Sequence, residues 1–123
     1  MTNLDRVKHM NQLAGEGKLL EAFDTYYHED SVKVEGNGDV VKGKAANRKF
    51  QVEWEESIEE FHGMGITALA EDPENGKVMM ESWADCTFKG GGRMKIEETE
   101  VQTWENGLIT HIRFYYDSAK MGG

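Results

Sequence analysis

The sequence predicts an α+β fold, a cone-shaped domain in which a curved antiparallel sheet wraps around three N-terminal helices. Apolar residues recur at helical spacing only in the first half of the chain. The second half alternates between two kinds of residue with period two, which is typical of strands. A sheet of long strands with one apolar face needs a covering layer, and only the helices are available to form it.

The first half of the chain predicts three helices around a short strand. Thr2 can cap a first helix that ends near Gly15, and a second helix begins near Lys18. Residues 31–35 follow as a strand, and Gly36 to Asp39 have the composition of a turn. A third helix is expected from Lys44 to about Ser57, with an acidic outer face.

The second half predicts a four-stranded antiparallel meander. Strands are expected at residues 59–70 and 77–89, joined by a turn at 72–76, and glycines at 90–92 lead into a final hairpin. Gly63 and Gly65 lie inside the first of these strands, where glycine marks a bulge or the close approach of another group.

The final hairpin, residues 93–117, turns at Asn106-Gly107, the pair that favours a type I′ turn. If these two residues form the turn, Trp104 pairs with Ile109, and strict alternation fixes every later pair. That register predicts an inner face toward the helices, formed by Thr99, Val101, Thr103, Ile112, Phe114 and Tyr116. It predicts an outer face that carries Trp104, Ile109, Gln102, His111, Glu100, Arg113, Glu98 and Tyr115.

Length and composition indicate one soluble domain over residues 1–123, which we expect in the cytoplasm. The chain has 14 basic and 23 acidic residues, a formal charge of −9, which argues against binding to nucleic acid or anionic membranes. No signal peptide or membrane span is seen. Cys86 is the single cysteine and is expected to be buried and inert. No histidine pair has ligand spacing, so we expect no metal and no cofactor.

Three stretches resemble the nuclear transport factor 2-like superfamily, which includes ketosteroid isomerases, SnoaL-like polyketide cyclases and limonene epoxide hydrolases. They are Tyr26 to Glu35, Val41-Lys42-Gly43-Lys44, and the hairpin from Trp104 to Asp117. The resemblance spans nearly the whole chain and implies the same cone. Its members commonly dimerise through the sheet. We therefore expect a homodimer through the outer face that bears Trp83, Trp104, His111 and Arg113.

The resemblance also implies positions for site residues. Glu35 falls where ketosteroid isomerases keep their catalytic Asp base, and Thr99 falls where they keep a protonated Asp. Met10 lies near the position of their oxyanion-hole Tyr. Phe114 falls where epoxide hydrolases keep a catalytic Asp. Of the steroid constellation, only the carboxylate at Glu35 is retained.

From the residues themselves, Glu35 is the candidate base, because a strand end beside a turn can hold a carboxylate at the mouth of the cone. Thr99 and Tyr116 are candidate donors to a ligand carbonyl. The expected ligand pocket is lined by Trp54, Met80, Ser82, Ala84, Glu97, Val101, Ile112 and Phe114. For each of these residues a structural alternative exists, as plain core for the apolar ones and rim exposure for Glu97.

Two functions remain open at this point. The first is a domain that binds a small apolar molecule and possesses isomerase, cyclase or lyase chemistry, in which a carboxylate base acts on a carbonyl-bearing substrate. The second is a non-catalytic ligand-binding or dimerisation module. A carboxylate that points into a cavity and has a raised pKa favours the first function.

Overall fold

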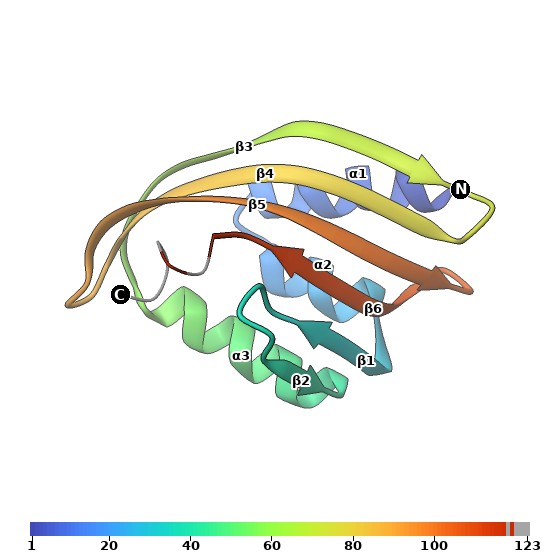
Figure 1. The fold of residues 1–123 in the computed structure, drawn as a ribbon, viewed down its shortest axis with the longest axis horizontal. Coiled ribbons are helices and arrows are strands. Elements are labelled where there is room, and N and C mark those ends of the chain that lie inside the picture. The colour runs from blue at the N-terminus through green and yellow to red at the C-terminus, as the bar shows by residue number, and fades with distance from the viewer. Residues whose placement is uncertain (118, 120–123) are drawn as a thin grey trace.

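The computed structural model describes residues 1–117 and 119, and its elements follow the predicted order (Figure 1), except that the first strand begins at Tyr27 rather than Ser31 and a short strand at residues 40–42 was not predicted. The helices are α1 (Asn3–Gly15), α2 (Leu19–Tyr26) and α3 (Lys44–Glu56). The strands are β1 (Tyr27–Val34), β2 (Val40–Lys42), β3 (Ile58–Asp72), β4 (Lys77–Phe88), β5 (Gly92–Glu105) and β6 (Leu108–Tyr115). The predicted α+β class is confirmed. The domain was expected to extend to residue 123, and residues 118 and 120–123 lie outside the described residues.

Six strands form one sheet in the order β2-β1-β6-β5-β4-β3. The antiparallel meander from β3 to β6 is the predicted one. The parallel pairing of β1 with β6 was not predicted, and it makes the sheet mixed. Figure 1 shows the long strands curving together, with α1 and α2 behind them and α3 beside β1 and β2. No helix within residues 1–117 is long and apolar enough to cross a membrane.

Local hydrogen bonds fix the helices as the sequence suggests. Thr2 caps α1, since its hydroxyl accepts from the Asp5 amide while the Asp5 carboxylate accepts from the Thr2 amide. Asn47 of α3 is 3% exposed, and its amide nitrogen donates to the carbonyls of Ser31, Val41 and Gly43. These bonds tie α3 to the first two strands and hold its inner face over the sheet.

The main apolar core joins α1 and α2 to the middle of the sheet. Val7, Trp104 and Ile109 are at most 4% exposed and belong to one cluster. The rings of Tyr26 and Trp104 meet edge to face, with centroids 5.8 Å apart. The core therefore lies near the Asn106-Gly107 end of the hairpin, and this cluster does not fill the rest of the concave face.

The predicted turn is confirmed, but the register beyond it is not. Asn106 and Gly107 have φ of 51° and 80°, and Trp104 pairs with Ile109 as expected. Thr103 then pairs with His111, so Thr110 is an extra residue in β6, a β-bulge. The bulge moves every later pair by one residue, which places Gln102 opposite Ile112 and Glu100 opposite Phe114.

This shift reverses the predicted facing of β5. Even-numbered residues of β5 from Glu98 to Trp104 point toward the helices, and Thr99, Val101 and Thr103 point outward. In β6 the prediction is correct for Ile112 and Phe114, which face inward, and wrong for Ile109, which was expected on the outer face and is buried in the core. Ile109 and Ile112 are both buried although three positions separate them, as a bulge between them requires.

The surface predicted for dimerisation is therefore wrong at one position. Trp104 is 4% exposed and lies under the helices, so it cannot belong to an outer face. Trp83, His111 and Arg113 do share the outer face, because their pairing partners are the outward residues Glu97, Thr103 and Val101. The outer face also presents Met79 and Tyr115, which are 40% and 50% exposed.

Gly65 has the close contact that its place in a strand suggested. A Cβ atom at Gly65 would lie 2.5 Å from the Trp83 ring nitrogen, whereas one at Gly63 would be 3.5 Å from the same ring. The Trp83 ring thus lies flat against β3, and only a glycine at position 65 leaves room for it.

We predict that Gly65→Ala lowers the free energy of unfolding by about 1–3 kcal/mol, because the indole must shift away from its packed position. Gly63→Ala is the matched control, two residues along the same strand, and should change stability by less than about 0.5 kcal/mol. Urea denaturation of both variants measures the difference. Equal stabilities would contradict the proposed packing.

Candidate functional site

A cavity of about 350 Å³ lies between the concave face of the sheet and the helices. All three helices and five of the strands or their ends contribute lining residues. Seven of the residues predicted from the sequence line this cavity: Glu35, Trp54, Met80, Ser82, Ala84, Phe114 and Tyr116.

The other four predicted residues lie elsewhere. Thr99 and Val101 face outward as a result of the bulge, and Glu97 lies on the same outer face with a side chain that is 74% exposed. Ile112 is 2% exposed and belongs to the apolar core. Thr99 therefore cannot donate to a ligand in this cavity, and the expected pair of Thr99 and Tyr116 is not brought together.

Glu35 takes part in an internal ion pair. Its Oε1 lies 3.2 Å from Lys33 Nζ, and its Oε2 accepts a 2.8 Å hydrogen bond from the Tyr116 hydroxyl. The Tyr116 ring lies directly against Gly36, where a Cβ atom would be only 2.9 Å away. Glycine at position 36 thus allows Tyr116 to reach Glu35. Burial, followed by the interaction with Glu35, raises the pKa of Tyr116 to about 12.

Lys33 is 8% exposed and carries the only ammonium group among the residues described as lining the cavity. Its Nζ is 3.2 Å from Glu35 and 3.0 Å from the centroid of the Phe50 ring, a cation–π contact. Burial lowers the pKa of Lys33, against the opposing attraction of Glu35 and Glu98. The cavity wall therefore already holds one organic cation between a carboxylate and an aromatic ring.

Two further carboxyl groups, Glu98 and Glu100, line the cavity and were not predicted as site residues. They are two residues apart on β5 and so share its inner face. Burial raises the pKa of Glu98 to about 7, with further contributions from the charges of Glu100 and Glu35. Burial also raises the pKa of Glu100 to about 7. Both groups are therefore partly protonated near neutral pH, the state that acid–base chemistry requires.

The two carboxyls differ in how they are held. Glu100 accepts a 2.9 Å hydrogen bond from Gln102 Nε2, and Gln102 Oε1 in turn accepts one of 2.9 Å from Trp104 Nε1. Within the described residues, no hydrogen bond or ion pair engages Glu98, whose nearest cross-strand neighbour on β4 is Ser82. Glu100 is thus fixed from the core side, and Glu98 is available to a ligand.

The sequence does show an alternating pattern at these residues, but the usual interpretation of such a pattern places them on the solvent-exposed face. Glu98, Glu100 and Gln102 alternate with Thr99, Val101 and Thr103, and polar residues of such a pattern ordinarily face water. The bulge at Thr110 instead places Gln102 and Glu100 opposite the inward residues Ile112 and Phe114.

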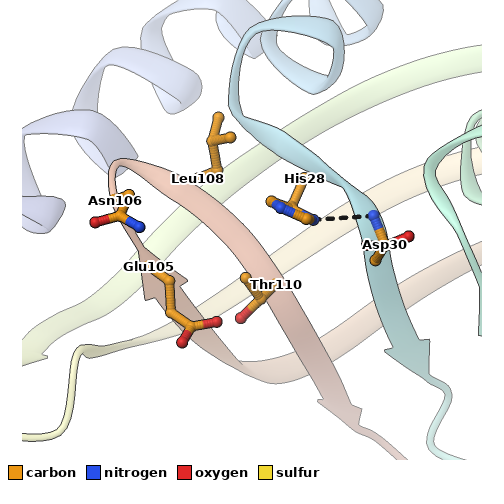
Figure 2. A pocket seen from close by; sticks show the side chains of 6 residues that line it. All are labelled: His28, Asp30, Glu105, Asn106, Leu108 and Thr110. Carbon is orange, nitrogen blue, oxygen red and sulfur yellow. Dashed lines mark hydrogen bonds between the residues drawn. The ribbon is translucent and has the colours of Figure 1, made fainter.

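A second hollow, of about 480 Å³, lies at the Asn106-Gly107 end of the sheet. Figure 2 shows its lining: His28, Asp30, Glu105, Asn106, Leu108 and Thr110. Its one marked hydrogen bond joins the Asp30 amide to His28 Nδ1. Asp30 and Glu105 are exposed, so water solvates both charges, and no group there is held for chemistry. The concave cavity is therefore the candidate site.

Residues 1–116 match the family model described as the SnoaL-like domain. The chain belongs to the SnoaL-like domain family. The match covers every element of the fold, and it confirms the resemblance noted in the sequence. No curated protein matches the chain.

Solved structures support the assignment of this SnoaL-like domain. A SnoaL-like protein from Mesorhizobium loti is 28% identical, over 94% of this chain and 100% of that chain, with a TM-score of 0.83. Two more distant structures share the fold. An LEH-like epoxide hydrolase from M. tuberculosis is 19% identical, over 97% of this chain and 85% of that one, with a TM-score of 0.75. A ketosteroid isomerase-like protein from Catenulispora acidiphila, in complex with trimethylamine, is 18% identical, over 82% and 77%, with a TM-score of 0.69.

We predict that Glu100→Gln removes a pH-dependent loss of stability. Because the pKa of Glu100 is higher in the folded than in the unfolded chain, the penalty on folding grows as pH rises from about 4.5 and reaches its full size above about 7. The variant should exceed the wild type in free energy of unfolding by about 2–3 kcal/mol at pH 8 and match it near pH 4.5.

Urea denaturation at the two pH values measures this difference. The glutamine can still accept the hydrogen bond from Gln102, so the contact that holds position 100 is kept. Glu97→Gln, on the exposed face of the same strand, is the control and should follow the wild type at both pH values. A Glu100→Gln variant that is equally destabilised at both pH values would contradict the assignment.

Proposed function

We propose that this SnoaL-like domain binds a small carbonyl-bearing molecule in the concave cavity and catalyses a proton transfer on it, an isomerase- or cyclase-type reaction. The observation that carries the proposal is Glu98. It is a cavity-lining carboxyl without a hydrogen-bond donor among the described residues, and its pKa is about 7. A general base works best when its pKa is near the operating pH, because it is then both deprotonated and basic enough to take a proton.

In this proposal Glu98 replaces Glu35 as the base. Glu35 is already paired with Lys33 and accepts from Tyr116, so removing a proton from a substrate would require breaking both contacts. Glu98 has no such contacts to break. Its Ser82 neighbour also lines the cavity and adds a hydroxyl that can orient a substrate atom.

Glu100 is the candidate for stabilising the negative charge that develops on the substrate oxygen. With a pKa of about 7 it retains its proton in a large fraction of molecules at neutral pH, and a protonated carboxyl is a strong hydrogen-bond donor. Ketosteroid isomerase uses a protonated carboxylic acid in this way. Here the Gln102 amide holds the Glu100 side chain in place.

The burial of the two carboxyls supports the proposal. Removing Glu98 and Glu100 from bulk water strengthens their interaction with a substrate, because the local dielectric constant is lower than that of water. The structure from Catenulispora acidiphila, which shares this fold, holds a small molecule, trimethylamine. A ligand of that scale is compatible with the cavity of about 350 Å³ described here.

We predict that the wild-type protein accelerates exchange of the α-protons of a small ketone with solvent deuterium and that Glu98→Gln abolishes this. Proton NMR with 2-tetralone as the probe measures the exchange rate. Loss of a general base should reduce the rate by about a hundred-fold or more. The wild-type rate should follow a bell-shaped pH profile centred near pH 7, because one carboxyl must be ionised and the other protonated.

Glu97→Gln is the matched control for this assay, since it removes one carboxylate from the adjacent position on the opposite face. It should retain the wild-type exchange rate. Ketone binding without accelerated exchange would instead identify a non-catalytic ligand-binding module, and an unchanged rate in Glu98→Gln would exclude Glu98 as the base.

We also propose that two copies of the chain associate through the outer face, with Trp83, His111 and Arg113 at the contact. Met79 and Tyr115 give that face the exposed apolar area that an isologous contact needs. Light scattering over a range of protein concentrations should give the mass of a dimer that Tyr115→Glu converts to a monomer. A wild-type monomer at every concentration would reject this arrangement.

A further inference from the structure

We propose that the cavity selects an organic ammonium ion, so that the substrate of this domain carries a protonated amine, recognised by the carboxylates of β5 and by the surrounding aromatic rings. The inference rests on the proposed function for the cavity as the ligand site and specifies the chemical class of the ligand.

The balance of charge in the cavity favours a cation. The titratable side chains described as lining it are Tyr27, Lys33, Glu35, Glu98, Glu100 and Tyr116. Lys33 and Glu35 pair with each other, at 3.2 Å, and their charges cancel. Lys33 attracts Glu98 at longer range, but neither Glu98 nor Glu100 forms an ion pair with a described residue. A positive ligand charge is what these two carboxyls lack.

The walls of the cavity suit an organic cation. Aromatic rings from both layers line it, including Phe50 and Trp54 on α3 and Tyr27 and Phe114 on the strands. Alkylammonium groups interact favourably with the faces of such rings. Lys33 provides an example within the chain, since its ammonium lies 3.0 Å from the centroid of Phe50 and beside a carboxylate. A ligand ammonium near Glu98 would have the same kind of surroundings.

A metal ion is a poorer fit than an amine. Within the described residues, no three His, Cys, Asp or Glu side chains are placed to hold a metal ion together. Glu98 and Glu100 share a cavity with Met80, Phe114 and other apolar side chains, which cannot replace the water of a hard cation. An alkylammonium ion carries its own apolar groups and needs only one or two acceptors.

Binding of a cation should be linked to release of a proton. Without ligand, Glu98 and Glu100 lower the cost of burial by retaining protons up to about pH 7. A bound ammonium favours the ionised form and lowers the pKa of the adjacent carboxyl. Amine affinity should therefore rise with pH up to about 7 and level off above it. A neutral ligand of the same shape should show no such rise.

Isothermal titration calorimetry with 2-phenylethylamine and with its neutral analogue 2-phenylethanol tests the inference at pH 5.5 and 7.5. The amine is protonated throughout this range, since alkyl ammonium groups have pKa values of about 10. At pH 7.5 we expect the amine to bind at least about ten-fold more tightly than the alcohol. At pH 5.5 its affinity should fall by about ten-fold or more, while that of the alcohol stays constant.

Glu98→Gln should reduce amine affinity at pH 7.5 by about ten-fold and leave alcohol affinity unchanged, and Glu97→Gln should bind both probes as the wild type does. Equal affinities for the two probes, an amine affinity that does not change with pH, or no binding of either at millimolar concentration would overturn the inference. Equal losses of amine affinity in Glu98→Gln and Glu97→Gln would also overturn it, because the amine would then be attracted only by the overall negative charge of the protein.

The ketone exchange assay separates this inference from the proposed function. Accelerated exchange without amine preference would leave proton transfer standing and reject the amine. Amine preference without exchange would support the amine and reject proton transfer.

Discussion

The extra residue at Thr110 determines what the inside of this molecule is made of. With strict alternation from the Asn106-Gly107 turn, Thr99, Val101 and Thr103 would face the helices, and the carboxyls of β5 would face water. The bulge reverses this for β5 while Ile109, Ile112 and Phe114 all stay inside. Because of this single backbone irregularity, the inner face of β5 carries Glu98, Glu100 and Gln102 in place of Thr99, Val101 and Thr103. The cavity is therefore lined by ionisable groups.

Placing carboxyl groups on the inner face of the sheet lowers the free energy of unfolding. Buried carboxyls are unfavourable when ionised, and an unpaired buried charge costs several kcal/mol. The chain lowers this cost in three ways. Lys33 and Tyr116 stabilise Glu35 as an anion, and Gln102 donates to Glu100. Glu98 has no hydrogen bond or ion pair among the described residues; burial raises its pKa to about 7 against a weaker attraction to Lys33, so it retains its proton up to about that pH. The least compensated group is the one that the proposed function uses as its base.

Most elements of the fold were readable from the sequence, because they begin or end at a local signal. Thr2 caps α1, and the Asn106-Gly107 pair forms the turn that its backbone preference dictates. The bulge has no such signal, because Thr110 is an ordinary strand residue and the constraint that places it there is tertiary. Seven of the eleven predicted site residues line the cavity, but Glu98 and Glu100 were not among those predicted. Binary patterning sends polar residues outward, and functional sites are where that rule fails.

Strand β5 also links the stability of the fold to the chemistry of the site. Along its inner face, Trp104 lies in the core and is 4% exposed, Gln102 is 2% exposed, and Glu100 is 7% exposed. Hydrogen bonds run in sequence from the Trp104 indole to Gln102 and from Gln102 to Glu100. Glu98 comes next, half-buried and unengaged by described residues. Over the seven residues from Trp104 to Glu98, the inner face of the strand thus passes from apolar core to a carboxyl that no described residue engages. Because each polar group is held by the one before it, packing around Trp104 controls the position of Glu100 and, through the charge of Glu100, the proton affinity of Glu98.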